Sequence, residues 1–292
     1  RYYVSGAFYS ESGLFVSDDS HDWDSKINYK RFNFTSNVDI NLHRTTVLKL
    51  NLNGVLEMKH QPYNSINTIF SDIMSVSPNV SPLYWPDADE FGNKRYAELQ
   101  GNIANPYNTL TQAGYNDNWW TKVNAMIALE QDLSELVTQG LKAAVKFSFD
   151  SDAWNQILRS GSPHTWYATG RDEIGNLLYN EMNMGSNTLG YTSYANGTRA
   201  LYIEGQVNYN RTFGNHNLNG LLLYNQREYQ EAVGSSIGAL PHRSQGLAAR
   251  VAYSYNDRYF IEGNFGYNGS ENFAPGKRFG FFPSVALGWM VS

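Results

Sequence analysis

Apolar and polar residues alternate along several segments of this chain. Segment 48–58 carries leucine or methionine at most even positions and lysine, asparagine or glutamate at most odd ones. Segments 31–42 and 141–150 repeat the pattern. Side chains of a β-strand point alternately to the two sides of its sheet, so a period of two places each set on its own face. Each segment is therefore predicted to be a strand with one apolar face.

The same pattern predicts about ten strands in the whole chain. Their expected bounds are 2–9, 27–43, 47–59, 119–131, 141–153, 199–211, 217–231, 245–255, 258–268 and 283–291. Short connections alternate with long ones, and segments 60–118 and 154–198 are too long for idle linkers. Outer-membrane barrels combine two-faced strands with tight turns on one side and long loops on the other. We predict an all-β fold, an antiparallel transmembrane β-barrel segment, with residues 1–292 belonging to one barrel domain.

Composition narrows the class of protein further. No apolar run reaches the roughly 18 to 20 residues that a membrane-spanning helix needs. The 15% aromatic content suits a membrane interface or a sugar-binding surface. A net charge of −5, with no cluster of lysine and arginine, argues against nucleic acid as a partner. The 292 residues include no cysteine, which excludes a disulfide scaffold and a thiolate metal site. Strand-like sequence at both ends predicts an internal part of a longer polypeptide.

No motif predicts catalysis, a metal or a cofactor. Histidines and carboxylates are present without the grouping of base, nucleophile and orienting group that an enzyme needs. Segment 87–98 approaches the spacing of a calcium loop, but Phe91 stands where an oxygen ligand is required and Pro86 precedes it. Four aspartates surround His21 in segment 18–24 without any ligand spacing. Segment 87–98 is interpreted as a solvated turn, and segment 18–24 as a polar loop.

Tyrosine and tryptophan gather in or beside the long segments. Their flat rings can stack on the apolar face of a sugar or contact peptide side chains. The same rings could instead pack the loops against one another or form an aromatic girdle at the membrane surface. The candidate ligand-binding residues are Tyr84, Trp85, Trp119, Trp120, Trp154, Trp166 and Tyr167.

Four stretches of the chain resemble the barrel of SusC-like (SusC/RagA) TonB-dependent outer-membrane transporters. The resemblance extends over nearly the whole chain and is most specific near its C-terminal end. The matching stretches are 29–39, 105–108 with 114–115, 140–143 and 258–289, and the most specific block runs from Phe273-Ala274-Pro275-Gly276 to Phe282-Pro283-Ser284.

The resemblance implies a plugged barrel of about 22 strands in the outer membrane of a Gram-negative bacterium. It also implies energy from TonB, a SusD-like surface lipoprotein as a lid, and import of an oligosaccharide or peptide. The plug, the signal peptide and the C-terminal strands are missing from this chain, so the segment alone is not expected to transport anything. Two alternatives remain open at this point, a soluble all-β carbohydrate-binding module with a closed core, and a passive porin.

The alternation predicts which side chains would face lipid and which would face the lumen of the barrel. The predicted lipid-facing residues are Leu50, Leu52, Val145, Phe147, Ile261 and Phe265. The predicted lumen-facing residues are Lys49, Asn51, Lys146, Glu262 and Asn264.

The number of crossings predicts on which side each connection lies. Two strands and one short turn separate segments 60–118 and 154–198, so both should lie on one side, which we take as extracellular. The loops after Glu231 and Ser270 should share that side. The turns at Arg44, 132–140, 213–216 and Asn256-Asp257 should all be periplasmic.

Overall fold

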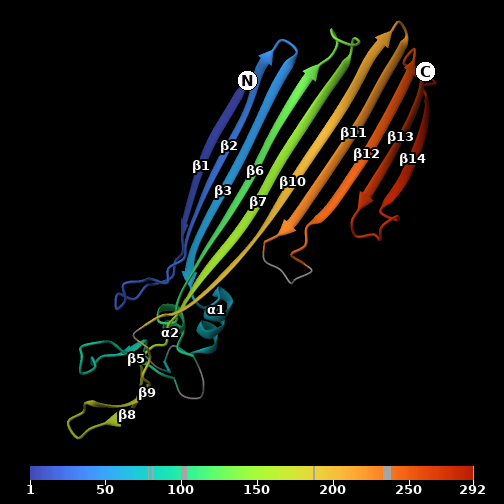
Figure 1. Ribbon diagram of the computed structural model, residues 1–292. Coiled ribbons are helices and arrows are strands. Elements are labelled where there is room, and N and C mark those ends of the chain that lie inside the picture. Colours follow the sequence, from blue (N-terminus) through green and yellow to red (C-terminus); the bar gives the residue numbers. More distant parts are fainter. Residues whose placement is uncertain (78, 81, 100–103, 187, 233–237, 292) are drawn as a thin grey trace.

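The computed structural model describes residues 1–77, 79–80, 82–99, 104–186, 188–232 and 238–291. Within them, ten strands form one sheet in which every neighbouring pair is antiparallel (Figure 1). Their order is β1-β2-β3-β6-β7-β10-β11-β12-β13-β14. The bounds are β1 Tyr2–Ser12, β2 Asn28–His43, β3 Thr46–Pro62, β6 Gly114–Asp132, β7 Leu141–Ser160, β10 Gly190–Phe213, β11 His216–Glu231, β12 His242–Tyr255, β13 Tyr259–Ser270 and β14 Phe279–Trp289.

All ten predicted strands are present, and the sheet is open, as a segment of a larger barrel requires. The predicted ends of three strands were wrong, because β6, β7 and β10 continue well into the two long segments. Gly114 and Gly190 both pair with Ser160, so the three strands extend together. The extra residues do not alternate between apolar and polar side chains. Their backbone N–H and C=O groups form hydrogen bonds with the neighbouring strands, and the local sequence does not indicate this pairing.

The two faces of the sheet differ as predicted. Residues that pair across neighbouring strands share a face, and the register joins Leu50, Ile127 and Phe147 in one row. The six residues predicted to face lipid all lie on this apolar face, and the five predicted to face the lumen lie on the opposite, polar face. On the apolar face Val145 is 59% exposed.

No second sheet packs against the apolar face in the part of the chain that the structure describes. Most large side chains that are buried lie beyond the sheet, among them Ile69, Leu99 and Leu110. A soluble module would bury its apolar strand faces in a closed core. Among the described residues the sheet has no such core, so the alternative of a soluble carbohydrate-binding module does not fit the fold.

Ion pairs join neighbouring strands across the polar face. The Nζ atom of Lys49 lies 2.7 Å from Glu130 Oε1, and that of Lys146 lies 3.0 Å from Glu204 Oε1. Farther along the sheet, a guanidinium nitrogen of Arg250 lies 2.6 Å from Glu262. Exposed pairs contribute little stability each. Their repetition on one face shows that this side of the sheet suits water.

The connections divide between the two ends of the sheet as the crossing count predicts (Figure 1). The short turns at Arg44, 132–140, 213–216 and 256–257 lie at one end, here called the turn end. Asn256 and Asp257 have φ of 53° and 50°, the left-handed conformation that a two-residue hairpin requires. The connections after β1, β3, β7, β11 and β13 all lie at the opposite end; part of the loop after Glu231 falls outside the described residues.

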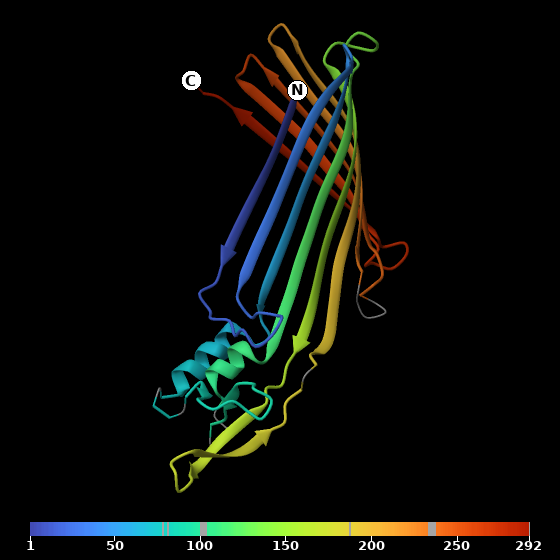
Figure 2. The same cartoon turned by 90° about the vertical axis from the view of Figure 1, so that its left-hand side faces the viewer.

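The long connections are folded, contrary to their assignment as loops, and form what we call the cap. It contains α1 (Ile66–Ser75), α2 (Pro106–Thr111) and a four-stranded sheet of β4 (Tyr84–Trp85), β5 (Arg95–Ala97), β8 (Thr165–Arg171) and β9 (Leu177–Asn183). Ser65 caps α1, and Asn105 with a following proline starts α2. Figure 2 shows the cap beyond the ends of β1 to β10, away from β12 to β14. None of the helices described is long and apolar enough to cross a membrane.

Candidate functional site

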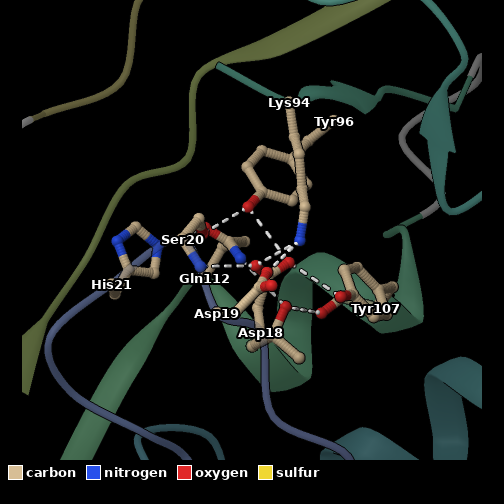
Figure 3. A network of polar contacts seen from close by, with 9 residues as sticks. Asp18, Asp19, Ser20, His21, Lys94, Tyr96, Tyr107 and Gln112 are labelled. Carbon is tan, nitrogen blue, oxygen red and sulfur yellow. Dashed lines mark hydrogen bonds and ion pairs between the residues drawn. The ribbon is translucent and has the colours of Figure 1, made fainter. Parts of the chain in front are cut away.

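One buried carboxylate, that of Asp18 in the connection between β1 and β2, binds several side chains of the cap (Figure 3). Only 1% of its side chain is exposed. Lys94 Nζ donates to Asp18 Oδ1 at 2.9 Å, and the Tyr107 hydroxyl donates to Oδ2 at 2.7 Å. The Tyr96 hydroxyl donates to Oδ2 at 3.1 Å, and the Ser20 backbone N–H donates to Oδ1 at 2.9 Å. These donors join the first connection to β5 and α2.

The charges of this cluster stabilise one another. Burial alone would raise the pKa of Asp18, but the hydrogen bonds from Lys94, Tyr107 and Ser20 outweigh it and hold the pKa well below its usual value. The bonds to Asp18 and Asp19 raise the pKa of Lys94. Burial, together with the charge of Asp18, raises the pKa of Tyr96 to about 12. The ion pair is therefore fully formed at neutral pH and joins the connection between β1 and β2 to the cap.

A polar pocket of about 490 Å³ lies beside this cluster. Its lining comes from three connections and includes Ser20, His21, Trp23, Lys94 and residues 161–164. His21 stacks on Trp23 with ring centroids 4.7 Å apart, and its Nε2 lies 2.5 Å from Gln112 Oε1. Hydroxyl, amide and charged groups around one aromatic platform suit a ligand rich in hydroxyl or amide groups.

Three of the predicted ligand-binding rings contact other cap residues. Trp85 Nε1 donates to the carbonyl oxygen of Trp166 at 2.9 Å. The Arg95 guanidinium lies 5.0 Å from the Trp166 ring centroid, and Lys94 Nζ lies 5.5 Å from that of Tyr84. Such contacts stabilise the small sheet, which is the packing role that the sequence left open. Tyr167 lies on β8 opposite Asn180.

Trp120 and Trp154 are placed differently, because they pair directly across β6 and β7 on the polar face. Trp154 was expected in a loop but is part of β7. Trp120 is 49% exposed and its indole nitrogen donates to Asp152. Together with 196–198 they line a hollow of about 280 Å³. Trp119, one residue away, lies on the apolar face opposite Met58.

The sequence did not single out Trp23, Gln112 or His164 as residues of the pocket. They come from three separate connections, and no local spacing relates them. In the near-calcium segment, Asp89 Oδ1 accepts hydrogen bonds from the backbone N–H groups of Phe91 and Asn93. Asp89 thus stabilises a turn, which is the interpretation given above.

The known proteins that this chain resembles include two TonB-dependent receptors. No family model matches the sequence. TonB-dependent receptor P3 of Formosa agariphila is 24% identical over 322 residues, an alignment covering 100% of this chain and 29% of that receptor. TonB-dependent receptor P39 of the same organism is 35% identical over 54 residues, 18% of this chain and 5% of that receptor.

Solved structures agree on the fold. The structure of the RagAB peptide transporter matches 98% of this chain and 32% of its own, with a TM-score of 0.60 and 13% identity. The RagAB peptide importer in the "open-open" state matches with a TM-score of 0.58 and 14% identity, covering 97% of this chain and 31% of that one. The chain thus spans less than a third of the first relative and about a third of the solved chains.

Proposed function

We propose that this chain, a segment of the barrel of a SusC-like TonB-dependent outer-membrane transporter, belongs to a receptor that imports an oligosaccharide or a peptide. The observation that carries the proposal is the uncovered two-faced sheet leading into a polar, aromatic cap. An exposed apolar face of this kind is stable against lipid, and the polar face then lines a lumen. A bulky polar nutrient would meet the cap before it enters that lumen.

The placement of the cap supports the proposed partners. A SusD-like surface lipoprotein would cover the barrel at the cap end, where folded connections offer a large surface beyond the membrane. TonB would act from the periplasm, on regions of the whole transporter beyond this segment. The cap end is therefore extracellular in this proposal and the turn end is periplasmic.

Labelling of intact cells tests this orientation. The segment has no cysteine, so single cysteines can be introduced at Ile174 in the cap and at Val137 in a short turn, which are 86% and 68% exposed. In a transporter without other accessible thiols, a membrane-impermeant maleimide should label Ile174→Cys on intact cells and Val137→Cys only after the outer membrane is opened. The reverse pattern would contradict the orientation, and equal labelling would contradict the membrane placement.

Ligand contact is expected at the paired tryptophans of the polar face. An aromatic platform contributes about 1 kcal/mol, so Trp120→Ala or Trp154→Ala should raise the nutrient concentration for half-maximal growth several-fold. Growth on pooled oligosaccharides or pooled peptides as the limiting nutrient measures the effect and separates the two classes. Trp119→Ala is the control, because its ring lies on the opposite face. An equal loss in the control would mean that the substitutions act through folding.

A further inference from the structure

The small sheet of the cap has two edges that differ in their protection. Its strand order is β4-β5-β8-β9, so β4 and β9 are the edge strands. An edge strand presents unpaired N–H and C=O groups, and proteins block such edges with short strands, proline or lysine. β4 has only two residues and is flanked by Pro82 and Pro86. β9 has seven residues, Leu177–Asn183, with neither proline nor lysine, so its edge is not blocked.

The backbone of β9 shows which groups face this edge. The Asn176 carbonyl oxygen accepts a hydrogen bond from the Asp172 N–H at 2.9 Å, and the Leu178 carbonyl oxygen accepts one from a hydroxyl of β8 at 3.3 Å. In an antiparallel pair the N–H and C=O of one residue point to the same side, and the side alternates along the strand. The N–H and C=O groups of Tyr179 and Glu181 therefore point away from β8, and they have no backbone partner among the described residues.

The side chains of these two residues hold the edge in place. The Tyr179 hydroxyl donates to Asp87 Oδ2 at 2.8 Å, and Glu181 Oε1 lies 2.8 Å from His164 Nε2. The contacts join β9 to the segment before β5 and to the segment before β8. Because the strand is already ordered, a second chain can pair with it without the entropic cost of ordering the edge first.

Three other side chains of β9 are exposed beside the edge. Leu178 and Met182 are 49% and 58% exposed, and Asn180 is exposed between them. In the part of the chain that the structure describes, none of these three side chains has a hydrogen-bond, ion-pair or ring partner. Permanent interfaces are more apolar than transient ones. The mixture of apolar and amide groups therefore favours an occupant that binds and leaves.

We propose that β9 binds the nutrient itself, as a peptide in extended conformation that adds a strand to the small sheet. In this mode the main chain supplies the hydrogen bonds, so peptides of many sequences are accepted. The flexible methionine at 182 fits apolar side chains of different shape. An oligosaccharide has no N–H and C=O groups at the spacing of a strand, so the edge selects a peptide. The inference rests on the proposed import function and chooses between its two nutrient classes.

The position of the hairpin formed by β8 and β9 agrees with this role. It lies at the end of the cap that is farthest from the ten-stranded sheet (Figure 2). In the proposed orientation this end is extracellular, so a peptide meets β9 before it reaches the polar face of the sheet. A strand of this length spans roughly 20 Å, which matches an extended peptide of similar length.

The test uses the full-length transporter and a tryptic digest of casein. Peptides that co-elute with the transporter are identified by mass spectrometry, and the most strongly retained one is synthesised for affinity measurements. Glu181→Pro removes the N–H that faces the edge, a position where an edge strand tolerates proline. Glu181→Ala is the matched control, because it removes the same side chain and keeps the N–H. We expect about tenfold weaker binding to Glu181→Pro than to Glu181→Ala.

N-methyl groups on the synthetic peptide give a second measurement, which does not depend on the folding of a variant. Each analogue carries one N-methyl group, and the series moves it along the peptide. Methylation of an N–H that faces β9 should weaken binding about tenfold, and methylation at the residues between should have a much smaller effect. A period of two in the affinities is the signature of strand pairing.

Three outcomes would overturn the proposal. They are retention of no casein peptide, equal affinity of Glu181→Pro and Glu181→Ala, and equal effects of N-methyl groups at successive residues. Hydrogen exchange of the β9 amides is the further comparison, and protection by the surface lipoprotein but not by the peptide would assign the edge to the lid and overturn the nutrient assignment. Growth on pooled oligosaccharides that depends on Trp120 and Trp154, with no peptide retained, would reject this inference and leave the proposed function standing.

Discussion

Replacing Val145 by arginine is expected to lower the free energy of unfolding of the full transporter in lipid by about 2 to 4 kcal/mol. Val145 lies in the middle of the outward residues of β7, between Leu141 and Phe149, and its side chain is 59% exposed. A charge there would face hydrocarbon in the proposed orientation. Denaturant titration of the protein in vesicles measures the cost.

Ala144→Arg is the matched control. It introduces the same side chain one residue earlier in β7, on the polar face directly opposite Glu130, and should cost far less. Lys146→Ala is a poorer control, because it leaves the Glu204 side chain, which is 11% exposed, without its lysine partner. Equal costs for Val145→Arg and Ala144→Arg would show that the assignment of the two faces to lipid and lumen is wrong.

Replacing Asp18 by asparagine is expected to destabilise the cap by about 2 to 3 kcal/mol, somewhat less than for a fully buried ion pair. The expected destabilisation is smaller because the side chain of Lys94 is 33% exposed and keeps Asp19 as a partner. The variant removes the charged acceptor shared by Lys94 and Tyr107. Hydrogen exchange of the amides of α2 and β5 in the full transporter measures the local loss.

Asp19→Asn is the control for this prediction, since Asp19 contacts the same lysine but its side chain is 89% exposed. Its exchange should resemble that of the wild type. Because the pKa of Asp18 is lowered on folding, its stabilisation is complete above the ordinary carboxyl pKa and declines only as the pH falls below about 4. Cap protection that depended on Asp18 but declined between about pH 7 and 5 would contradict the ion-pair account.

The ten strands and their two faces could be predicted because both depend on a local pattern. A period of two in the side chains specifies a strand and its apolar face without reference to any distant residue. The crossing count then placed every long connection at one end, since an antiparallel hairpin returns the chain to the side it left. Asn256-Asp257 was recognised as a tight turn for the same local reason, a tolerance of positive φ.

The fold of the cap and the grouping of the candidate site residues could not be predicted from local pattern. Lys94 meets Asp18 across 76 residues, and Trp120 stands opposite Trp154 only because β6 and β7 continue beyond their alternating parts. Ser65 and Asn105 carried helix-start signals, but short helices are stable only when packed on other elements. The sequence by itself determined the ten-stranded sheet and its two faces through local periodicity, whereas tertiary contacts between distant segments decided the fold of the cap and the pocket beside Asp18.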